Sequence, residues 1–396
     1  MPSIIDISFK VNINVLRVSG LYLPDKFKSL YQVYTYVTYF LLVIPVPILE
    51  CVNLLVQEQI TFRQIADNAF LIAELGCFIP KYWPFVRHGE RLKRCIHYFS
   101  APIFKTDKKE HKEILKDCVK VCHYSTAFYF ASVTAGFCSW SIRPIYWQNH
   151  IFPTDIWLPF DPHTAPKLHV ACVYFYLVLA VGYGAYTSAA IDSMVPCLAY
   201  QATSQIKILK NNLKYLGEQV DEELASHTPN LDPSIKAKLM YKKIRRCVIH
   251  HEHILAFVKE YEECFSQVAF SQFIGGVVVF CVSCLQLTIV DILSFDFLAM
   301  MMYLIAMLSE VYLYCHFGTI FYHESDTIRD AIYLGKWYEF DIKSKKALNI
   351  LMERLKKPLN IRCGKILDMS LVTFTMILRR SYSLLAVLEN YNIDLN

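Results

Sequence analysis

The sequence predicts an all-α membrane protein with seven transmembrane helices, and three observations support this fold class. The 396 residues are 55% hydrophobic and 19% charged, whereas about 25% charged residues are usual in a soluble protein. Four segments contain no charged residue and exceed the roughly 18 residues that a membrane helix needs. They are residues 29–49, 124–142, 168–191 and 264–290. The third observation is the uneven distribution of Lys and Arg, which defines an orientation.

Three further segments complete the seven. Residues 297–322 are interrupted only by Glu310, and residues 68–86 contain Glu74 and Lys81. The last segment lies near the C-terminus and is the most polar of the seven. We therefore predict a single domain, residues 1–396, with spans at approximately 29–56, 67–87, 123–144, 167–200, 263–291, 297–322 and 363–389.

Lys and Arg gather in alternate segments of the chain. Residues 1–28 hold four of them, and residues 87–120, 207–259 and 329–365 hold ten each, whereas the remaining loops hold only Arg63, Arg143 and Lys167. Basic segments stay in the cytoplasm, so we predict a cytoplasmic N-terminus and an extracellular C-terminus. A G-protein-coupled receptor has seven spans in the opposite orientation, so the pattern argues against that class. No cleavable signal peptide is visible, and we expect the first span to act as the targeting signal.

A sizeable cytoplasmic helical layer is also predicted. The helices of spans 4 and 5 continue as polar helices beyond the membrane, and residues 324–357 supply further anchor helices before the last span. Such a layer could hold subunits together below the membrane. His250, His251 and His253 lie in it, but neighbouring histidines point to different helix faces, so we expect no metal site there. No phosphate loop, nucleophile elbow or HExxH motif is present, and we predict neither an enzyme, nor a cofactor, nor a nucleic-acid partner.

The last predicted span has an unusual polar stripe. Its members are spaced three, four or seven residues apart, so they would share one helical face: Asp368, Thr375, Arg379, Tyr382, Ala386 and Glu389. A charge near the bilayer centre costs roughly 3 kcal/mol on insertion scales, so such residues usually face water or a partner. Two interpretations remain open from the residues alone: a helix lining a water-filled pore shared between subunits, and a polar helix buried in its own bundle.

The chain resembles the insect odorant receptors, most specifically from span 6 onward. One group of residues is similar to that family's approach to helix seven: Gly318, Glu324, Ser325, Ala331, Tyr333, Trp337 and Tyr338. A second group is similar to its terminal signature: Pro358, Leu359, Gly364, Lys365, Ser370, Leu371, Phe374, Tyr382, Ser383 and Leu388. Asp192, Gln205, Leu209 and the segment 253–268 also agree. The chain departs from the family pattern at Cys363, Asp368 and Leu384.

The resemblance implies a subunit of a tetrameric ligand-gated cation channel in the plasma membrane of an olfactory neuron. The partner would be a co-receptor, which carries a long insertion between spans 4 and 5. That connection is of ordinary length in this chain, so the resemblance implies a tuning subunit rather than the co-receptor. The gate would fall on Leu385 and Leu388, with Glu389 and Asp394 near the outer mouth of the pore.

The resemblance further implies that a volatile ligand binds in the outer half of spans 2 to 6. Small-molecule sites are mostly apolar with few polar groups, and the candidate positions fit that description, although they also fit ordinary helix packing. The candidates are Phe70, Ala73, Glu74, Val133, Gly136, Phe137, Trp140, Tyr176, Ala180, Tyr183, Met301 and Leu304.

Two alternative functions remain. A gustatory-type receptor of the same superfamily would differ in ligand polarity rather than in architecture. A secondary transporter would use Glu74, Asp192, Glu310 or Arg379 near the membrane midplane. Transporters usually show internal repeats and broken helices, and the sequence shows no convincing repeat.

Overall fold

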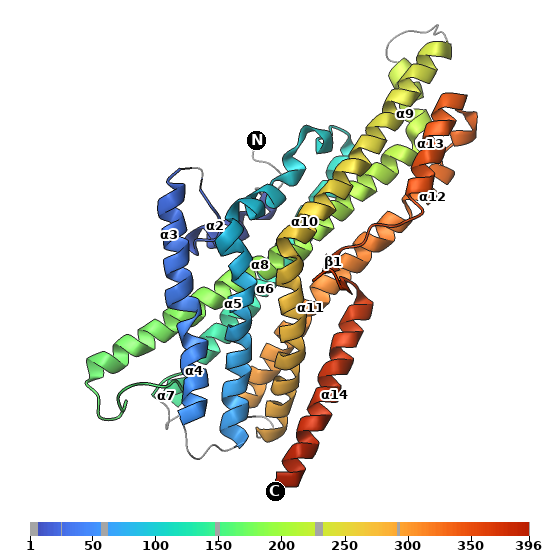
Figure 1. Cartoon of the computed structure of the whole chain (residues 1–396). Helices are drawn as coiled ribbons and strands as arrows, with labels where there is room; N and C mark the ends of the chain where they lie inside the picture. The colour runs from blue at the N-terminus through green and yellow to red at the C-terminus, as the bar shows by residue number, and fades with distance from the viewer. Residues whose placement is uncertain are drawn as a thin grey trace.

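Long helices make up almost the whole structure, a computed structural model (Figure 1). The described residues are 7–24, 26–56, 62–146, 151–225, 233–290 and 294–395. The helices and strands are α2 (Lys10–Val18), α3 (Lys28–Thr38), η1 (Tyr39–Val43), α4 (Pro45–Val56), α5 (Phe62–Ile96), η2 (Tyr98–Ser100), η3 (Pro102–Phe104), α6 (Lys109–Ser141), α7 (Arg143–Tyr146), α8 (Lys167–Lys214), α9 (Leu216–Ala225), α10 (Pro233–Ile289), α11 (Phe295–Asp326), α12 (Ile328–Tyr333), η4 (Trp337–Glu339), α13 (Ile342–Arg354), β1 (Arg362–Cys363), β2 (Leu367–Asp368) and α14 (Leu371–Leu395).

Each of the first six predicted spans overlaps a helix or a run of helices, and the first overlaps α3, η1 and α4 in succession. Four helical segments of the described chain are long and apolar enough to cross a membrane by length and composition, namely residues 28–56, 167–214, 234–288 and 297–333. The other predicted spans, α5, α6 and α14, are more polar, and in α5 the cause includes Glu74 and Lys81.

The prediction for the start of the last span was wrong. We expected a helix over residues 363–389, but α14 begins at Leu371. Residues 362–368 instead form a short antiparallel hairpin, in which Arg362 pairs with Asp368. Gly364 and Lys365 sit at its turn with φ of 61° and 63°, a left-handed conformation that glycine adopts without strain. Asp368 therefore lies on a strand and does not belong to the polar face of the helix.

The hairpin is fixed to two neighbouring helices. The backbone N–H of Gly364 donates to the carbonyl of Ser266 on α10, at 3.0 Å. Gly318 of α11 lies so close to the start of α14 that a Cβ atom there would come within 2.0 Å of the carbonyl oxygen of Met369. The entry to α14 thus has a defined position against α10 and α11, because backbone approaches backbone at this point.

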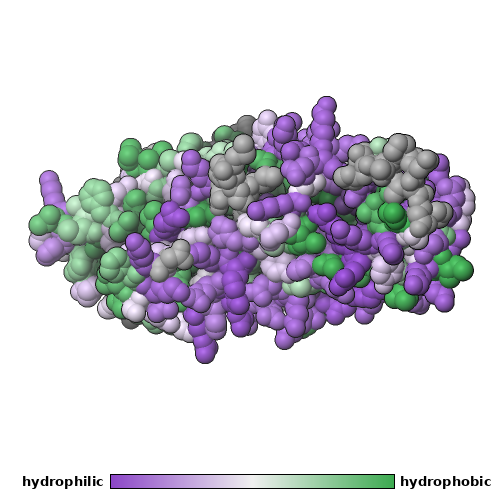
Figure 2. Space-filling model, turned by 90° about the horizontal axis from the view of Figure 1, so that it is seen from above, coloured by the Kyte–Doolittle hydropathy of each residue, from purple (hydrophilic) through white to green (hydrophobic). Residues whose placement is uncertain are grey.

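One end of the bundle carries a layer of helices beyond the predicted spans. We call it the inner end, because the sequence predicts that it is cytoplasmic. The long α8 and α10 reach it and are joined there by α9, α12 and α13 (Figure 1). Lys210 of α8 contacts Glu324 of α11 at 2.7 Å and ties two of these elements together. Viewed from this end, the molecule is largely hydrophilic, with hydrophobic residues gathered at one edge (Figure 2).

Two histidines are buried in the inner layer. His250 and His251 lie on α10 and are 5% and 3% exposed. His250 contacts the amide of Gln205 on α8 at 3.2 Å. Burial lowers the pKa of each imidazole to about 4, because charging a ring removed from water is costly. The layer is therefore packed around neutral histidines at physiological pH.

Candidate functional site

One lysine and two acidic side chains meet inside the helix bundle. Lys81 of α5 contacts Asp192 of α8 at 2.5 Å and Glu310 of α11 at 3.6 Å, and the three side chains are 1%, 0% and 2% exposed. A buried charge in a membrane helix is costly unless it is paired. The sequence signal for this site is a charged residue within or next to each of three apolar segments, and we name Lys81, Asp192 and Glu310 the buried ion triad.

Neighbouring helices supply hydrogen bonds to the triad. The Lys81 ammonium also donates to Ser188 of α8, at 2.8 Å, and to Gln272 of α10, at 2.7 Å. The hydroxyl of Tyr314 donates to Asp192 at 2.9 Å, and that of Tyr129 on α6 donates to Glu310 at 2.5 Å. Five helices are thus joined at one level. Sequence reasoning did not identify the four neutral partners, because they resemble ordinary membrane-helix residues.

The triad contains two carboxyl groups and one ammonium group. Asp192 accepts hydrogen bonds at both oxygens, whereas Oε1 of Glu310 has no hydrogen-bond partner among the described residues and only the 3.6 Å ion pair with Lys81. Glu310 is therefore the less well satisfied of the two acids. The two ion pairs connect α5 with α8 and with α11, since each charged side chain belongs to a different helix.

A second polar contact lies nearer the outer end. The hydroxyl of Tyr303 on α11 donates to Glu74 on α5 at 2.8 Å. Each is seven residues from the triad member of its own helix, a separation of about 10 Å along the axis. Ala73 is half-buried beside Glu74, and Met301 and Leu304 are half-buried beside Tyr303. The structure thus places Glu74 against Tyr303 of α11, a residue that lies between the predicted ligand residues Met301 and Leu304 in the sequence.

The α6 members form an aromatic group with α8. The Phe137 ring lies 6.2 Å from that of Trp140 and 5.8 Å from that of Tyr186, measured between ring centroids. A Cβ atom on Gly182 would come within 3.0 Å of the Phe137 ring, so the two helices approach closely here. Val133 is half-buried on the same helix, whereas Gly136 faces open space.

Trp140 has a hydrogen-bond donor that the described part of the chain leaves without an acceptor. Its indole Nε1 is buried, and no described residue accepts a hydrogen bond from it. Trp and Tyr side chains usually find a partner when they are buried. The indole N–H is therefore a candidate for holding the polar atom of a ligand within an otherwise apolar group.

Tyr176 and Tyr183 on α8 point toward the first span instead. Tyr176 donates to the carbonyl of Leu41 at 2.7 Å, and Tyr183 donates to the carbonyl of Ser19 at 2.6 Å. Ala180, between them in sequence, is 2% exposed. This face of α8 therefore packs against the N-terminal region, apart from the group around Phe137. The side chain of Phe70 lies outside the described residues.

The last helix presents a free polar face. Thr373, Ile377 and Ser381 are buried against the bundle. The opposite side is open to its surroundings, and four of its side chains are exposed: Thr375, Arg379, Arg380 and Tyr382. Leu385 is half-buried, whereas the side chains of Leu388, Glu389 and Asp394 lie outside those described. Of the predicted polar stripe, Thr375, Arg379 and Tyr382 thus face away from the bundle, where the apolar Val372 and Val387 are exposed as well.

A bundle of seven long helices around a buried ion triad defines a polytopic membrane protein. Residues 61–382 match the family model described as 7tm Odorant receptor, and the chain belongs to the insect odorant receptor family.

Individual relatives agree with this assignment. The chain is 24% identical over 340 residues to odorant receptor Or1 of Anopheles gambiae, covering 83% of this chain and 81% of that receptor. It is 20% identical over 392 residues to odorant receptor 43b of Drosophila melanogaster, covering 96% of this chain and 91% of that receptor. Its fold is similar to that of the olfactory receptor OR5 of Machilis hrabei, solved in complex with eugenol. The TM-score is 0.80 at 17% identity, and the match covers 97% of both chains.

Proposed function

We propose that this chain is the odorant-binding subunit of a ligand-gated, non-selective cation channel in the plasma membrane of an olfactory neuron. In this proposal the N-terminus and the inner layer are cytoplasmic, and the C-terminus is extracellular. The single observation that carries the proposal is the match of residues 61–382 to the odorant receptor family. The ordinary connection between α8 and α10 favours a tuning subunit that assembles with a co-receptor into a tetramer.

The proposed ligand site lies in the outer half of the bundle. The aromatic group around Phe137 and the indole N–H of Trp140 support it, as does the Glu74–Tyr303 contact on the facing helices. An apolar wall with one or two polar groups suits a volatile molecule that has a single oxygen function. A receptor of similar fold, OR5 of Machilis hrabei, was solved in complex with a small aromatic molecule, eugenol.

The proposed pore is lined by the free face of α14. Its exposed threonine, arginines and tyrosine would be costly against lipid, but they would be stable against water in a shared central pore. Leu385 and Leu388 are the proposed gate, which would close by dewetting, with Glu389 and Asp394 near the mouth. Odorant binding would open the gate if the odorant has a higher affinity for the open state than for the closed state.

Whole-cell recording tests the proposal. The chain is expressed with and without an insect co-receptor, and volatile esters, alcohols, phenols and aldehydes are applied. We expect a non-selective cation current only when both subunits are present. Glu389→Gln should alter the cation permeability ratio, and the neighbouring variant Asn390→Gln serves as its control. Uptake of a labelled solute without a current would instead support the secondary transporter.

The gustatory-type alternative is tested in the same recordings. Polar, non-volatile tastants such as sugars and bitter alkaloids are applied beside the volatile panel. Responses confined to the tastants would contradict an odorant-binding subunit, while leaving the channel architecture intact. The family match favours the volatile panel, because the matching model is that of the odorant receptors.

A further inference from the structure

A basic cleft lies at the inner ends of α3 and α5, away from the proposed odorant site and pore. Its volume is about 280 Å³, and it is bounded by the N-terminal arm near Gly20, by Gln32 and Thr35 of α3, and by residues 85–91 and Arg94 of α5. Arg87, Arg91 and Arg94 all line it. A second cavity of about 510 Å³ lies against the same arm and is lined by Arg17, Tyr22, Pro24, Lys93 and His97.

The cleft has a surplus of positive charge. Its one acidic side chain, Glu90, forms an ion pair with Lys28 at 2.7 Å, and Arg94 is engaged by Glu260 at 3.4 Å. Among the described residues, no ion pair is formed by Arg87 or Arg91. Arginine binds phosphate through two parallel N–H donors, and two unpaired arginines in one cleft therefore suit a phosphate group.

A local break in α5 shapes the cleft. His88 departs from helical geometry, with φ of −132° and ψ of 44°, and it lines the cleft between Val86 and Gly89. Across this break Arg87 and Arg91 still face the same space, although ordinary helix geometry no longer holds them. Breaks of this kind cost free energy and persist where the surrounding structure maintains them.

The cleft lies at the level of the membrane surface. The predicted second span ends at residue 87, so the arginines follow directly after it. Trp83, one helical turn before Arg87, is 41% exposed, and its ring lies 5.8 Å from that of Tyr39. Amphipathic aromatic side chains are enriched where a bilayer meets water. On the far side of α3 from the cleft, Leu30 and Val33 are 71% and 58% exposed, as expected for residues that face lipid tails.

We propose that this cleft binds the phosphorylated headgroup of an anionic phospholipid of the cytoplasmic leaflet. Arg87 and Arg91 would hold the phosphate, Gln32 and Thr35 would contact the headgroup hydroxyls, and the acyl chains would pass Trp83 into the bilayer. A lipid is favoured over a soluble phosphate because the charged wall continues directly into an aromatic and apolar membrane-facing surface. Basic pockets between membrane helices on the cytoplasmic side are suited to such headgroups.

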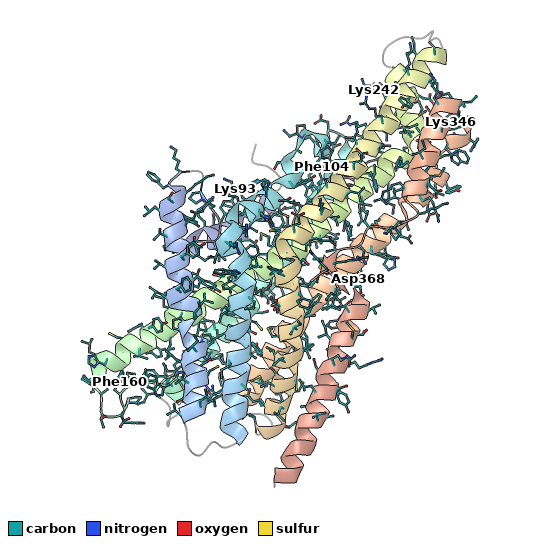
Figure 3. All side chains as sticks on the ribbon, in the orientation of Figure 1. Lys93, Phe104, Phe160, Lys242, Lys346 and Asp368 are labelled. Atoms are coloured by element: carbon teal, nitrogen blue, oxygen red, sulfur yellow. The ribbon has the colours of Figure 1, made fainter. Side chains whose placement is uncertain are left out.

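The inference rests on the cytoplasmic orientation proposed above, but not on the odorant or the pore. Lys93 marks this region of α5 in Figure 3, whereas Lys242 and Lys346 lie farther along the inner layer, well apart from it. A double variant at Lys242 and Lys346 is therefore the control, because it removes two positive charges, as the variant at Arg87 and Arg91 does, but at exposed positions far from the cleft.

The test measures lipid binding by the purified full chain in detergent. A fluorescent phosphatidylinositol bisphosphate is titrated and its anisotropy is recorded. The Arg87→Gln/Arg91→Gln chain should bind it about 30-fold more weakly, from the usual strength of a basic residue at an anionic membrane surface. The Lys242→Gln/Lys346→Gln control should bind within about two-fold of the unchanged chain, since general surface charge contributes little at such a distance. Gln32→Glu, which keeps both arginines, should also weaken binding.

Three outcomes would overturn the inference. The first is equal weakening by the control pair, which would mean non-specific attraction. The second is equally tight binding of soluble inositol trisphosphate or inorganic phosphate, which would identify a soluble ligand. The third is unchanged binding by the arginine variant that elutes as a folded chain in gel filtration. An odorant-evoked current that persists in any of these cases would leave the proposed function standing.

Discussion

Removing Lys81 should destabilise the protein far more than neutralising Glu310. Lys81→Met leaves two carboxyl groups at 0% and 2% exposure without their cation. Breaking a buried ion pair in this way costs about 3–5 kcal/mol. Glu310→Gln leaves the 2.5 Å contact between Lys81 and Asp192 intact, and the new amide oxygen can still accept from Tyr129. We expect a cost within about 1 kcal/mol for that change.

Thermal denaturation in detergent, followed by fluorescence-detected gel filtration, distinguishes the two variants. Lys81→Met should lower the midpoint by about 5 °C or more, and Glu310→Gln by at most about 2 °C. Lys120→Met is the control, because Lys120 is 70% exposed and its pair with Asp117 is a surface contact. If Glu310→Gln proved as damaging as Lys81→Met, the triad would not contain a surplus acid, and the electrostatic reasoning would fail.

Two further predictions concern the helix junction and the inner layer. Gly318→Ala should disrupt the start of α14, since its Cβ would meet the carbonyl of Met369 at 2.0 Å. Gly136→Ala, with nothing within 4 Å, should be tolerated, and the surface yield of folded channel measures both. Acid should loosen the inner layer, because His250 and His251 have a pKa of about 4 when folded against 6.5 normally. Their stabilisation is complete above pH 6.5 and is lost as the pH falls toward 4, by up to about 3 kcal/mol each, which hydrogen exchange of α10 would detect.

The sequence predicted where the long helices of the bundle lie, because runs without charge favour helices that are buried in an apolar environment. It did not predict the start of α14. The segment from Pro358 looks continuous in hydropathy, but the turn at Gly364 is stabilised by its contact with Ser266 on α10. Such a contact joins residues nearly a hundred positions apart, and no local pattern encodes it.

The buried ion triad was also only partly predictable from the sequence. A charge inside an apolar run predicts that Lys81, Asp192 and Glu310 each need a partner, but the sequence does not say that they partner one another. Helical periodicity likewise places Tyr176 and Tyr183 on one face of α8. It cannot determine that this face meets the first span instead of the aromatic group near Phe137. Which neighbour a helix face contacts depends on how all the helices pack together, so it is a property of the whole bundle.

The length of α10 has a mechanical consequence. Its 57 residues form one helix of about 85 Å, which begins in the inner layer and ends at the outer side of the bundle. Although the helix bends where it enters the bundle (Figure 1), a displacement at one end is transmitted to the other through one run of backbone hydrogen bonds. The inner layer is consequently not a detachable module, and in the proposed channel a movement of α10 near the odorant site would reach the inner layer through this helix.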